Sequence, residues 1–219
     1  MGTVGTTLIS YGDITNQIRN VFRLRSGDKV ILFDGSGRDF VATITGYEKD
    51  SVSFKIEEVS DNNVSPKKKI YLFASIVKKD TFEWIAQKAT ELGVTHIIPV
   101  LAERSEKKNL NIERLQKIIT EAAEQSGRAT LPELHEIITL PDALKRYSDI
   151  ASIAWNIEAP KFVSQDLKDI QGIYIGPEGG WSEKELTLFK ENNIGIYSLG
   201  PQVLRAETAV VATLAQFVF

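Results

Sequence analysis

The chain has 219 residues, of which 42% are hydrophobic and 25% are charged, and its formal net charge is −3. This length fits one large domain or two small ones, and the composition is that of an ordinary globular protein. The absence of cysteine excludes disulfide bonds, catalytic thiolates and zinc sites built from cysteine. The bulk charge gives no basic footprint for nucleic acid, so any basic face must be local.

The absence of cysteine favours a cytoplasmic protein, and the hydropathy pattern predicts no membrane partner. No apolar run approaches the ~18 residues that a membrane-spanning helix needs. Residues 1–7 lack the basic segment followed by an apolar one that marks a signal peptide.

The first 59 residues have the pattern of an antiparallel β structure. Residues 29–33 lead into an Asp-Gly-Ser-Gly turn, and residues 40–45 and 51–57 follow as further strands. We expect these strands to close into a small β-barrel, because open sheet edges are hazardous and isolated hairpins are unstable. Before them, four apolar residues predict a short helix with Arg19 and Arg23 on its other side: Ile14, Ile18, Val21 and Phe22.

A polar stretch at residues 60–69 separates this part from the rest of the chain, and it contains turn-forming residues and Pro66. From residue 70 onward, apolar strands alternate with amphipathic helices, which predicts a parallel sheet with helices on both faces. The sequence therefore predicts two domains, residues 1–66 and 67–219, the second of class α/β. Its expected elements include a strand at 134–138 and a last helix at 204–219.

Two histidines are present, His96 and His135, and both fall in predicted strands. Neither has metal-ligand spacing to a partner, so we expect structural histidines and no metal site.

A glycine-rich loop at residues 176–180, Gly-Pro-Glu-Gly-Gly, follows an apolar run and precedes a helix signal. Ser182 and Glu185 have the spacing of a capping box, which predicts that the helix starts at Ser182. Glycines at the carboxyl end of a strand let the backbone approach a ligand. The alternative is a tight strand-to-helix turn without a ligand.

A second loop of this kind, residues 199–209, reads Leu-Gly-Pro-Gln-Val-Leu-Arg-Ala-Glu-Thr-Ala. Two such loops after neighbouring strands would form a backbone-lined pocket with apolar walls, which suits an adenine nucleoside. The phosphate-binding P-loop and the Gly-x-Gly-x-x-Gly dinucleotide motif are both missing. Asn156 and Glu158 follow another predicted strand end and are candidates for contact with the same ligand.

The two loops together resemble the signature of the RsmE family, which are bacterial SPOUT-class methyltransferases that methylate N3 of a uridine in 16S ribosomal RNA. Segments 22–28, 33–35, 91–94, 103–105 and 121–128 also resemble that family, so the resemblance covers nearly the whole chain.

The resemblance implies a C-terminal trefoil knot, an N-terminal PUA-like β-barrel that binds RNA, and a homodimer that acts on 16S rRNA in the small ribosomal subunit. It also implies S-adenosylmethionine as cofactor, held by residues of the two glycine loops. These residues are Ile175, Gly176, Pro177, Glu178, Gly179, Gly180, Leu199, Gly200, Val203, Leu204, Thr208 and Ala209.

Arg205 and Glu207 are the candidate catalytic residues. Uridine N3 carries a proton, so methyl transfer to it needs a base or a cation that stabilises the uridine anion. Glu207 is the candidate base, and Arg205 is the candidate to bind phosphate or to stabilise charge on a uracil oxygen. The alternative is that the two residues cap the last helix or pair with each other.

The candidate RNA-binding residues are Arg19, Arg23, Arg104 and Arg128, because arginine suits phosphate contact. Solvated surface charge is the alternative for each of them. Two other functions stay open: a SPOUT enzyme that acts on tRNA or on a ribose 2′-oxygen, and an RNA-binding protein without catalysis.

Overall fold

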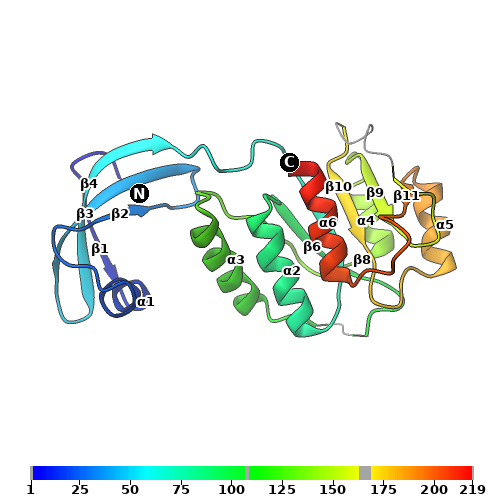
Figure 1. Cartoon of the computed structure of the whole chain (residues 1–219), viewed down its shortest axis with the longest axis horizontal. Helices are drawn as coiled ribbons and strands as arrows, with labels where there is room; N and C mark the ends of the chain where they lie inside the picture. Colours follow the sequence, from blue (N-terminus) through cyan, green and yellow to red (C-terminus); the bar gives the residue numbers. More distant parts are fainter. Residues whose placement is uncertain (1, 107–108, 163–168, 219) are drawn as a thin grey trace. The chain divides into compact units, whose positions relative to one another are not determined.

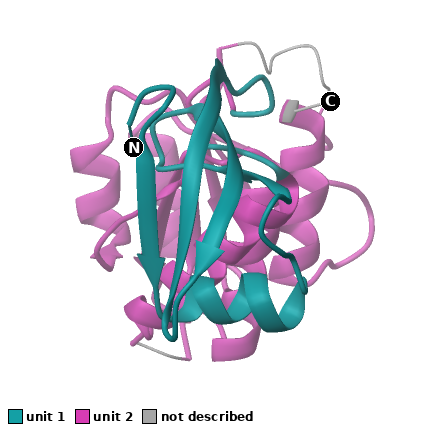
Figure 2. Cartoon of the chain, turned by 90° about the vertical axis from the view of Figure 1, so that its left-hand side faces the viewer, with its two compact units in different colours: residues 1–65, 127–130 teal, residues 66–126, 131–219 magenta. Residues whose placement is uncertain are grey.

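The computed structural model describes residues 2–106, 109–162 and 169–218. The chain divides into two compact units (Figure 2). The first contains residues 1–65 and 127–130, and the second contains residues 66–126 and 131–219. Within the described residues, no helix combines the length and the apolar character needed to cross a membrane.

Unit 1 is built on an antiparallel sheet of four strands in the order β1-β4-β3-β2. Alternate residues of the two central strands form its core, among them Phe40, Ile44 and Phe54. The ladder leaves β1 and β2 as edges, so strand pairing among the described residues does not close the predicted barrel. The strands are β1 (Thr7–Tyr11), β2 (Lys29–Leu32), β3 (Arg38–Tyr47) and β4 (Ser51–Asp61).

The predicted amphipathic helix after β1 is irregular. One turn of α-helix, α1 (Asp13–Asn16), continues into the π-helix η1 (Gln17–Val21). The i→i+5 hydrogen bonds of a π-helix, such as Phe22 N to Gln17 O at 2.9 Å, change the residue period and rotate the apolar positions away from one face. A helical segment is thus present where the sequence predicted one, but of its apolar residues Ile18 is buried and three are exposed: Ile14, Val21 and Phe22.

Residues 127–130 belong to unit 1 although they follow a helix of unit 2. The Asn62 side chain donates to the Gly127 carbonyl at 3.0 Å, and the Ala129 N–H donates to Ser65 Oγ at 3.0 Å. Short polar contacts between distant segments of this kind leave no mark in the local sequence pattern. The predicted boundary after residue 66 therefore gave no sign of this returning segment.

Unit 2 contains a seven-stranded sheet in the order β11-β9-β10-β5-β6-β7, with β8 paired beside β7 on β6. Every pairing in it is parallel, which confirms the predicted α/β class. The strand predicted at 134–138 is split into β7 and β8. The strands are β5 (Tyr71–Ser75), β6 (His96–Leu101), β7 (Glu133–Leu134), β8 (Ile138–Thr139), β9 (Ser152–Trp155), β10 (Gly172–Ile175) and β11 (Gly195–Tyr197).

Helices cover both faces of this sheet (Figure 1). Successive strand residues point to opposite faces, so Ile173 packs with α2, α3 and α6, whereas Tyr174 packs with α4 and α5. The last helix begins two residues later than predicted, and residue 219 lies outside the described residues. The helices are α2 (Lys79–Glu91), α3 (Ile112–Ser126), α4 (Leu140–Arg146), α5 (Glu183–Glu191) and α6 (Ala206–Val218).

Candidate functional site

A pocket of about 230 Å³ lies at the carboxyl ends of the neighbouring strands β9, β10 and β11. Its wall comes from three stretches that leave these strands, at residues 155–157, 175–181 and 199–209. In a parallel sheet the carboxyl ends of all strands meet at one edge, which is where ligands of α/β proteins bind. The two glycine loops therefore meet in space, as their positions in the sequence predicted.

The first glycine loop turns tightly and then starts α5. The Gly180 N–H donates to the Pro177 carbonyl at 2.8 Å, and Gly180 has a φ of 68°, in the left-handed region that favours glycine. Ser182 is the N-cap of α5 and forms the predicted capping box with Glu185. The helix start predicted from the sequence is thus confirmed.

Trp181 fastens this loop to the end of β9. Its indole Nε1 donates to the Trp155 carbonyl at 3.1 Å, and its side chain is 4% exposed. The ring also lies against the backbone of Gly176, where an added Cβ atom would come within 3.2 Å of indole atoms. Gly176 is therefore needed for this close approach, and the loop and the ring are fitted to each other.

A carboxylate network holds the other side of the loop. Glu185 accepts from the backbone N–H of Glu103 and from that of Ser182, both at 2.8 Å. The Ser182 hydroxyl donates to Glu103 Oε2 at 2.6 Å. Because Glu103 follows β6 and Ser182 starts α5, these bonds tie the glycine loop to a second strand end.

Arg104, which was predicted to bind RNA, also contacts this loop. Its Nη1 donates to the Gly179 carbonyl at 2.8 Å, and the side-chain carbons lie 3.4 Å from where a Cβ atom of residue 179 would stand. The side chain is exposed beyond this contact. Arg104 thus supports the pocket wall, and its RNA contact stays a prediction.

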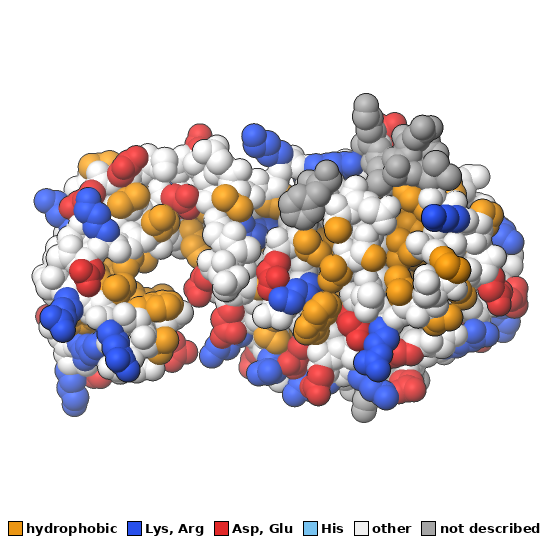
Figure 3. Space-filling view, in the orientation of Figure 1, with side chains coloured by type: hydrophobic (Ala, Val, Ile, Leu, Met, Phe, Trp, Pro, Cys, Tyr) orange, Lys and Arg blue, Asp and Glu red, His pale blue; other side chains and the backbone are white. Residues whose placement is uncertain are grey.

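The second loop makes the more open wall. Val203 is 81% exposed although it lines the pocket together with Gln202 and Leu204. Upstream, Ser198 donates to the Pro160 carbonyl at 2.8 Å and accepts from the Phe162 N–H at 3.0 Å. The stretch after β9 is therefore paired to the stretch after β11 beside the pocket. Figure 3 shows hydrophobic side chains gathered on this face of unit 2 along α6 and the loop before it.

The predicted cofactor residues all line this pocket except Gly200 and Thr208. The candidate Asn156 lines it as well. Sequence reasoning missed five lining residues: Trp155, Ile157, Trp181, Gln202 and Ala206. Trp155 and Ile157 had a usable signal, because they flank Asn156 at a third strand end.

Arg205 and Glu207 flank Ala206, which lines the pocket. Arg205 Nη1 lies 4.0 Å from Glu207 Oε1, so the two side chains form an ion pair, which was the alternative foreseen from the sequence. The Arg205 side chain is 86% exposed and that of Glu207 is 21% exposed. An exposed pair of this kind contributes little to stability.

The remaining predicted RNA-binding arginines belong to unit 1. Arg19 donates to the carbonyls of Lys49 and Glu48, and its guanidinium lies 4.9 Å from the centre of the Tyr47 ring. Arg23 is exposed with a φ of 57°. Figure 3 shows Lys and Arg side chains gathered near α1.

Arg128 differs from the other three predicted RNA-binding arginines because its side chain is buried, and burial lowers the pKa of its guanidinium to about 10. A buried guanidinium offers less of its surface to RNA than the exposed Arg23 does.

The sequence suggested that the two histidines are isolated, but in the structure their side chains are in contact. His96 Nδ1 lies 3.1 Å from His135 Nε2, and Glu133 reaches both rings. Spacing along the chain gave no sign of this cluster, because strand pairing brings residues 39 positions apart into contact. The expectation of structural histidines without a metal ion stays a prediction.

Comparison with known proteins gives a consistent result over both units. A family model described as an RNA methyltransferase domain matches residues 64–218, and one described as an RNA methyltransferase PUA domain matches residues 12–57. Ribosomal RNA small subunit methyltransferase E of Rickettsia conorii is 34% identical over 205 residues, which cover 91% of this chain and 84% of that protein. The protein of the same name from Bacillus subtilis is 32% identical, with 93% and 86% covered.

Two solved structures extend the similarity to the fold. A methyltransferase from Legionella pneumophila in complex with S-adenosylmethionine superposes with a TM-score of 0.89 at 30% identity, and 99% of this chain and 93% of that one are covered. Ribosomal RNA small subunit methyltransferase E from Neisseria gonorrhoeae, bound to S-adenosyl methionine, gives 0.87 at 32% identity, with 98% and 92% covered. The chain therefore belongs to the ribosomal RNA small subunit methyltransferase E family.

Proposed function

We propose that this protein transfers a methyl group from S-adenosylmethionine to N3 of a uridine in 16S rRNA of the small ribosomal subunit. The observation that carries the proposal is the pocket at the ends of β9, β10 and β11, which is lined by both glycine loops. The relatives from Legionella pneumophila and Neisseria gonorrhoeae were solved with this cofactor. The names of the relatives supply the class of RNA substrate.

The residues present fit the cofactor. Ile175, Leu199 and Leu204 give the pocket apolar walls that suit the faces of an adenine ring. Gly176 and Gly179 keep side chains out of the wall, so backbone groups are free to read the polar edges of the nucleoside. When bound, S-adenosylmethionine supplies a methyl group activated by its sulfonium centre.

Glu207 and Arg205 act on the uridine that accepts the methyl group. In the proposed reaction, the Glu207 carboxylate accepts the proton that leaves uridine N3, and Arg205 stabilises the negative charge that develops on a uracil oxygen. Both residues are chain neighbours of Ala206, which lines the pocket, and their side chains form a 4.0 Å ion pair. Correct placement of N3 lowers the barrier further, by up to about 7–11 kcal/mol in favourable cases.

Glu207→Gln tests the assignment of the base. The variant keeps a side chain of similar size but cannot accept the proton, so we expect turnover to fall about a hundredfold or more while cofactor affinity is unchanged. Full turnover with normal cofactor binding would remove Glu207 from the mechanism.

The same proposal includes the trefoil knot and the homodimer. The pairing of Ser198 with residues 160–162 continues the β9–β11 ladder beside the pocket, which is where the proposal puts the knot. The exposed apolar residues Val203 and Leu204, next to α6, support a second copy of the chain as partner.

RNA contact in the proposal comes from the arginines predicted for it, Arg19, Arg23, Arg104 and Arg128. Arginine side chains near phosphate oxygens position an RNA without reading its sequence. Arg23, which is exposed on unit 1, is the best placed of them to meet RNA from solvent. The proposed substrate also makes the cytoplasm the place of action.

The decisive experiment supplies purified protein and S-adenosylmethionine with a labelled methyl group to small subunits and to bare 16S rRNA from a deletion strain. Mass spectrometry of the digested RNA should find label in N3-methyluridine. Label only in a ribose 2′-O-methyl nucleoside, or only when tRNA is offered, would support a different enzyme of the class. Calorimetry that detects no cofactor binding would favour an RNA-binding protein without catalysis.

A further inference from the structure

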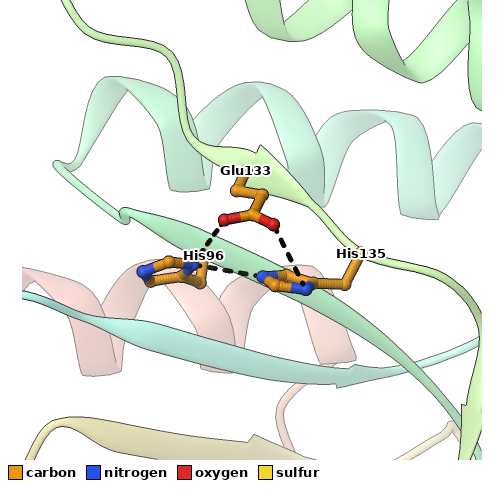
Figure 4. Close-up of side chains that lie close together, drawn as sticks. All are labelled: His96, Glu133 and His135. Carbon is orange, nitrogen blue, oxygen red and sulfur yellow. Dashed lines mark hydrogen bonds and ion pairs between the residues drawn. The ribbon is translucent and has the colours of Figure 1, made fainter.

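We propose that His96, Glu133 and His135 form a binding site for a divalent transition-metal ion of the Zn²⁺ type. His96 is the first residue of β6, and the sheet register places Glu133 of β7 directly beside it. His135 follows β7 by one residue. Figure 4 shows the Glu133 carboxylate facing both imidazole rings, with one oxygen joined to His96 and the other to His135.

The spacing of the ligand atoms fits a tetrahedral ion. Zinc binds imidazole nitrogen and carboxylate oxygen at about 2.0–2.2 Å, which puts neighbouring ligand atoms of a tetrahedron about 3.3–3.5 Å apart. His96 Nδ1 lies 3.1 Å from His135 Nε2 and 3.5 Å from Glu133 Oε2. Each of the three residues offers one ligand atom, and these three atoms all lie within 4.8 Å of one another. Small side-chain rotations therefore suffice to bind the ion.

Neighbouring aromatic residues hold both rings in place. The Tyr71 ring is stacked on His96, with centroids 4.2 Å apart and planes 5° apart. His135 uses Nε2 toward His96, and its other nitrogen, Nδ1, lies 3.4 Å from the Tyr147 hydroxyl and 3.7 Å from Glu133 Oε1. A metal-binding histidine usually has its second nitrogen engaged in this way, which fixes the tautomer and the ring orientation.

The donor set selects the class of ion. Two imidazoles and one carboxylate suit Zn²⁺, Co²⁺ or Ni²⁺, whereas Mg²⁺ and Ca²⁺ prefer oxygen ligands alone. The histidine side chains are 17% and 20% exposed and that of Glu133 is 65% exposed, so an ion can enter from solvent through the carboxylate side. Three protein ligands leave a fourth position for water.

The site lies away from the cofactor pocket within unit 2. His96 starts β6, whereas Ile175 ends β10 and lines the pocket. The strand between them, β5, is parallel to both. The ion would therefore stand at the amino ends of the strands. There it joins the short edge strand β7 to β6, so its role is structural and not part of methyl transfer.

The test uses protein freed of any polyhistidine tag and dialysed against a chelator, then titrated with Zn²⁺ by calorimetry. We expect one ion per chain, a raised melting temperature, and, with Co²⁺, the visible absorption bands of a tetrahedral complex. His135→Gln should abolish this binding, and Glu133→Gln should weaken it at least about tenfold. Glu136→Gln is the matched control, because Glu136 is a nearby exposed carboxylate outside the cluster.

Two results would overturn the proposal. One is no uptake of ion by the native chain, which would leave the two rings as a histidine pair joined by one N–H···N hydrogen bond. The other is equal affinity in the native chain and in Glu133→Gln. The second variant decides the matter even if His135→Gln does not fold, because the Glu133 side chain is mostly exposed and its loss leaves no buried gap.

Discussion

Gly176→Ala should damage the cofactor pocket through Trp181. The added methyl group would stand 3.2 Å from indole Cε2 and Nε1, which is too close for carbon without movement. Trp181 cannot move freely, since it is 4% exposed and its Nε1 donates to the Trp155 carbonyl at 3.1 Å. The substitution therefore forces a choice between a strained loop and a stretched buried hydrogen bond.

The magnitude follows from these two effects. Overpacking of a buried site by one methyl group costs about 1–3 kcal/mol. Weakening of one buried hydrogen bond has a net effect of about 0.5–1.5 kcal/mol and accounts for part of that range. For a chain of this size, 1–3 kcal/mol corresponds to a fall in melting temperature of about 2–12 °C. A shift of the pocket wall that loses about 1.4 kcal/mol of binding weakens S-adenosylmethionine about tenfold.

The assay is a double-mutant cycle with Trp181→Phe, measured by urea unfolding and by calorimetric titration of S-adenosylmethionine. A phenyl ring lacks the indole Nε1, so Gly176→Ala should cost at least 1 kcal/mol less in that background. Gly46→Ala is the control, because a Cβ atom there meets nothing within 4 Å and Gly46 lies in unit 1. Equal costs of Gly176→Ala in both backgrounds would refute the proposed contact.

Three further changes test other parts of the molecule. Ser182→Ala removes the N-cap of α5 and should lower the free energy of unfolding by about 1 kcal/mol. Equal stability of the variant and the native chain in urea unfolding would contradict this role of Ser182. Arg205→Ala should reduce RNA methylation about a hundredfold with cofactor affinity unchanged, and parallel losses in both would contradict its assignment to the acceptor. The hydrogen bond from Lys29 lowers the pKa of Glu57, so its contribution to stability is present above pH 4.5 and is lost as the pH falls through the folded-state pKa. Glu57→Gln should flatten the fall in urea midpoint below pH 4.5, and an unchanged curve would show that the pair contributes nothing.

The parts of the site that depend on local geometry could be predicted from the sequence. A capping box and two glycine loops have short, fixed spacings, so Ser182 and Glu185 marked the start of α5 correctly. The alternation of strands and helices then placed both loops at one edge of a parallel sheet. These inferences needed no knowledge of which residues meet across the fold.

The parts that could not be predicted depend on contacts between distant segments. Trp181 donates to Trp155 across 26 positions, and His96 meets His135 across 39. Neither pair has a spacing that a motif search would recognise, because the distance along the chain is set by intervening helices and loops. The π-helix at residues 17–21 could not be predicted for a different reason. Its residue period differs from the roughly 3.6 residues per turn on which the prediction of helices from sequence patterns is based.

A pocket walled by backbone depends on the stiffness of its loops more than on their side chains. Gly179 can contribute a well-placed backbone only while its carbonyl is held, and the 2.8 Å bond from Arg104 holds it from the far side of the wall. The hydrogen bond from the Glu103 N–H to the Glu185 carboxylate likewise holds the end of the loop in place. Residues that never face the cofactor should therefore control its affinity, whereas Arg205 outside the wall should control turnover. A separation of cofactor affinity from turnover between these two groups is what a site with distinct donor and acceptor halves requires.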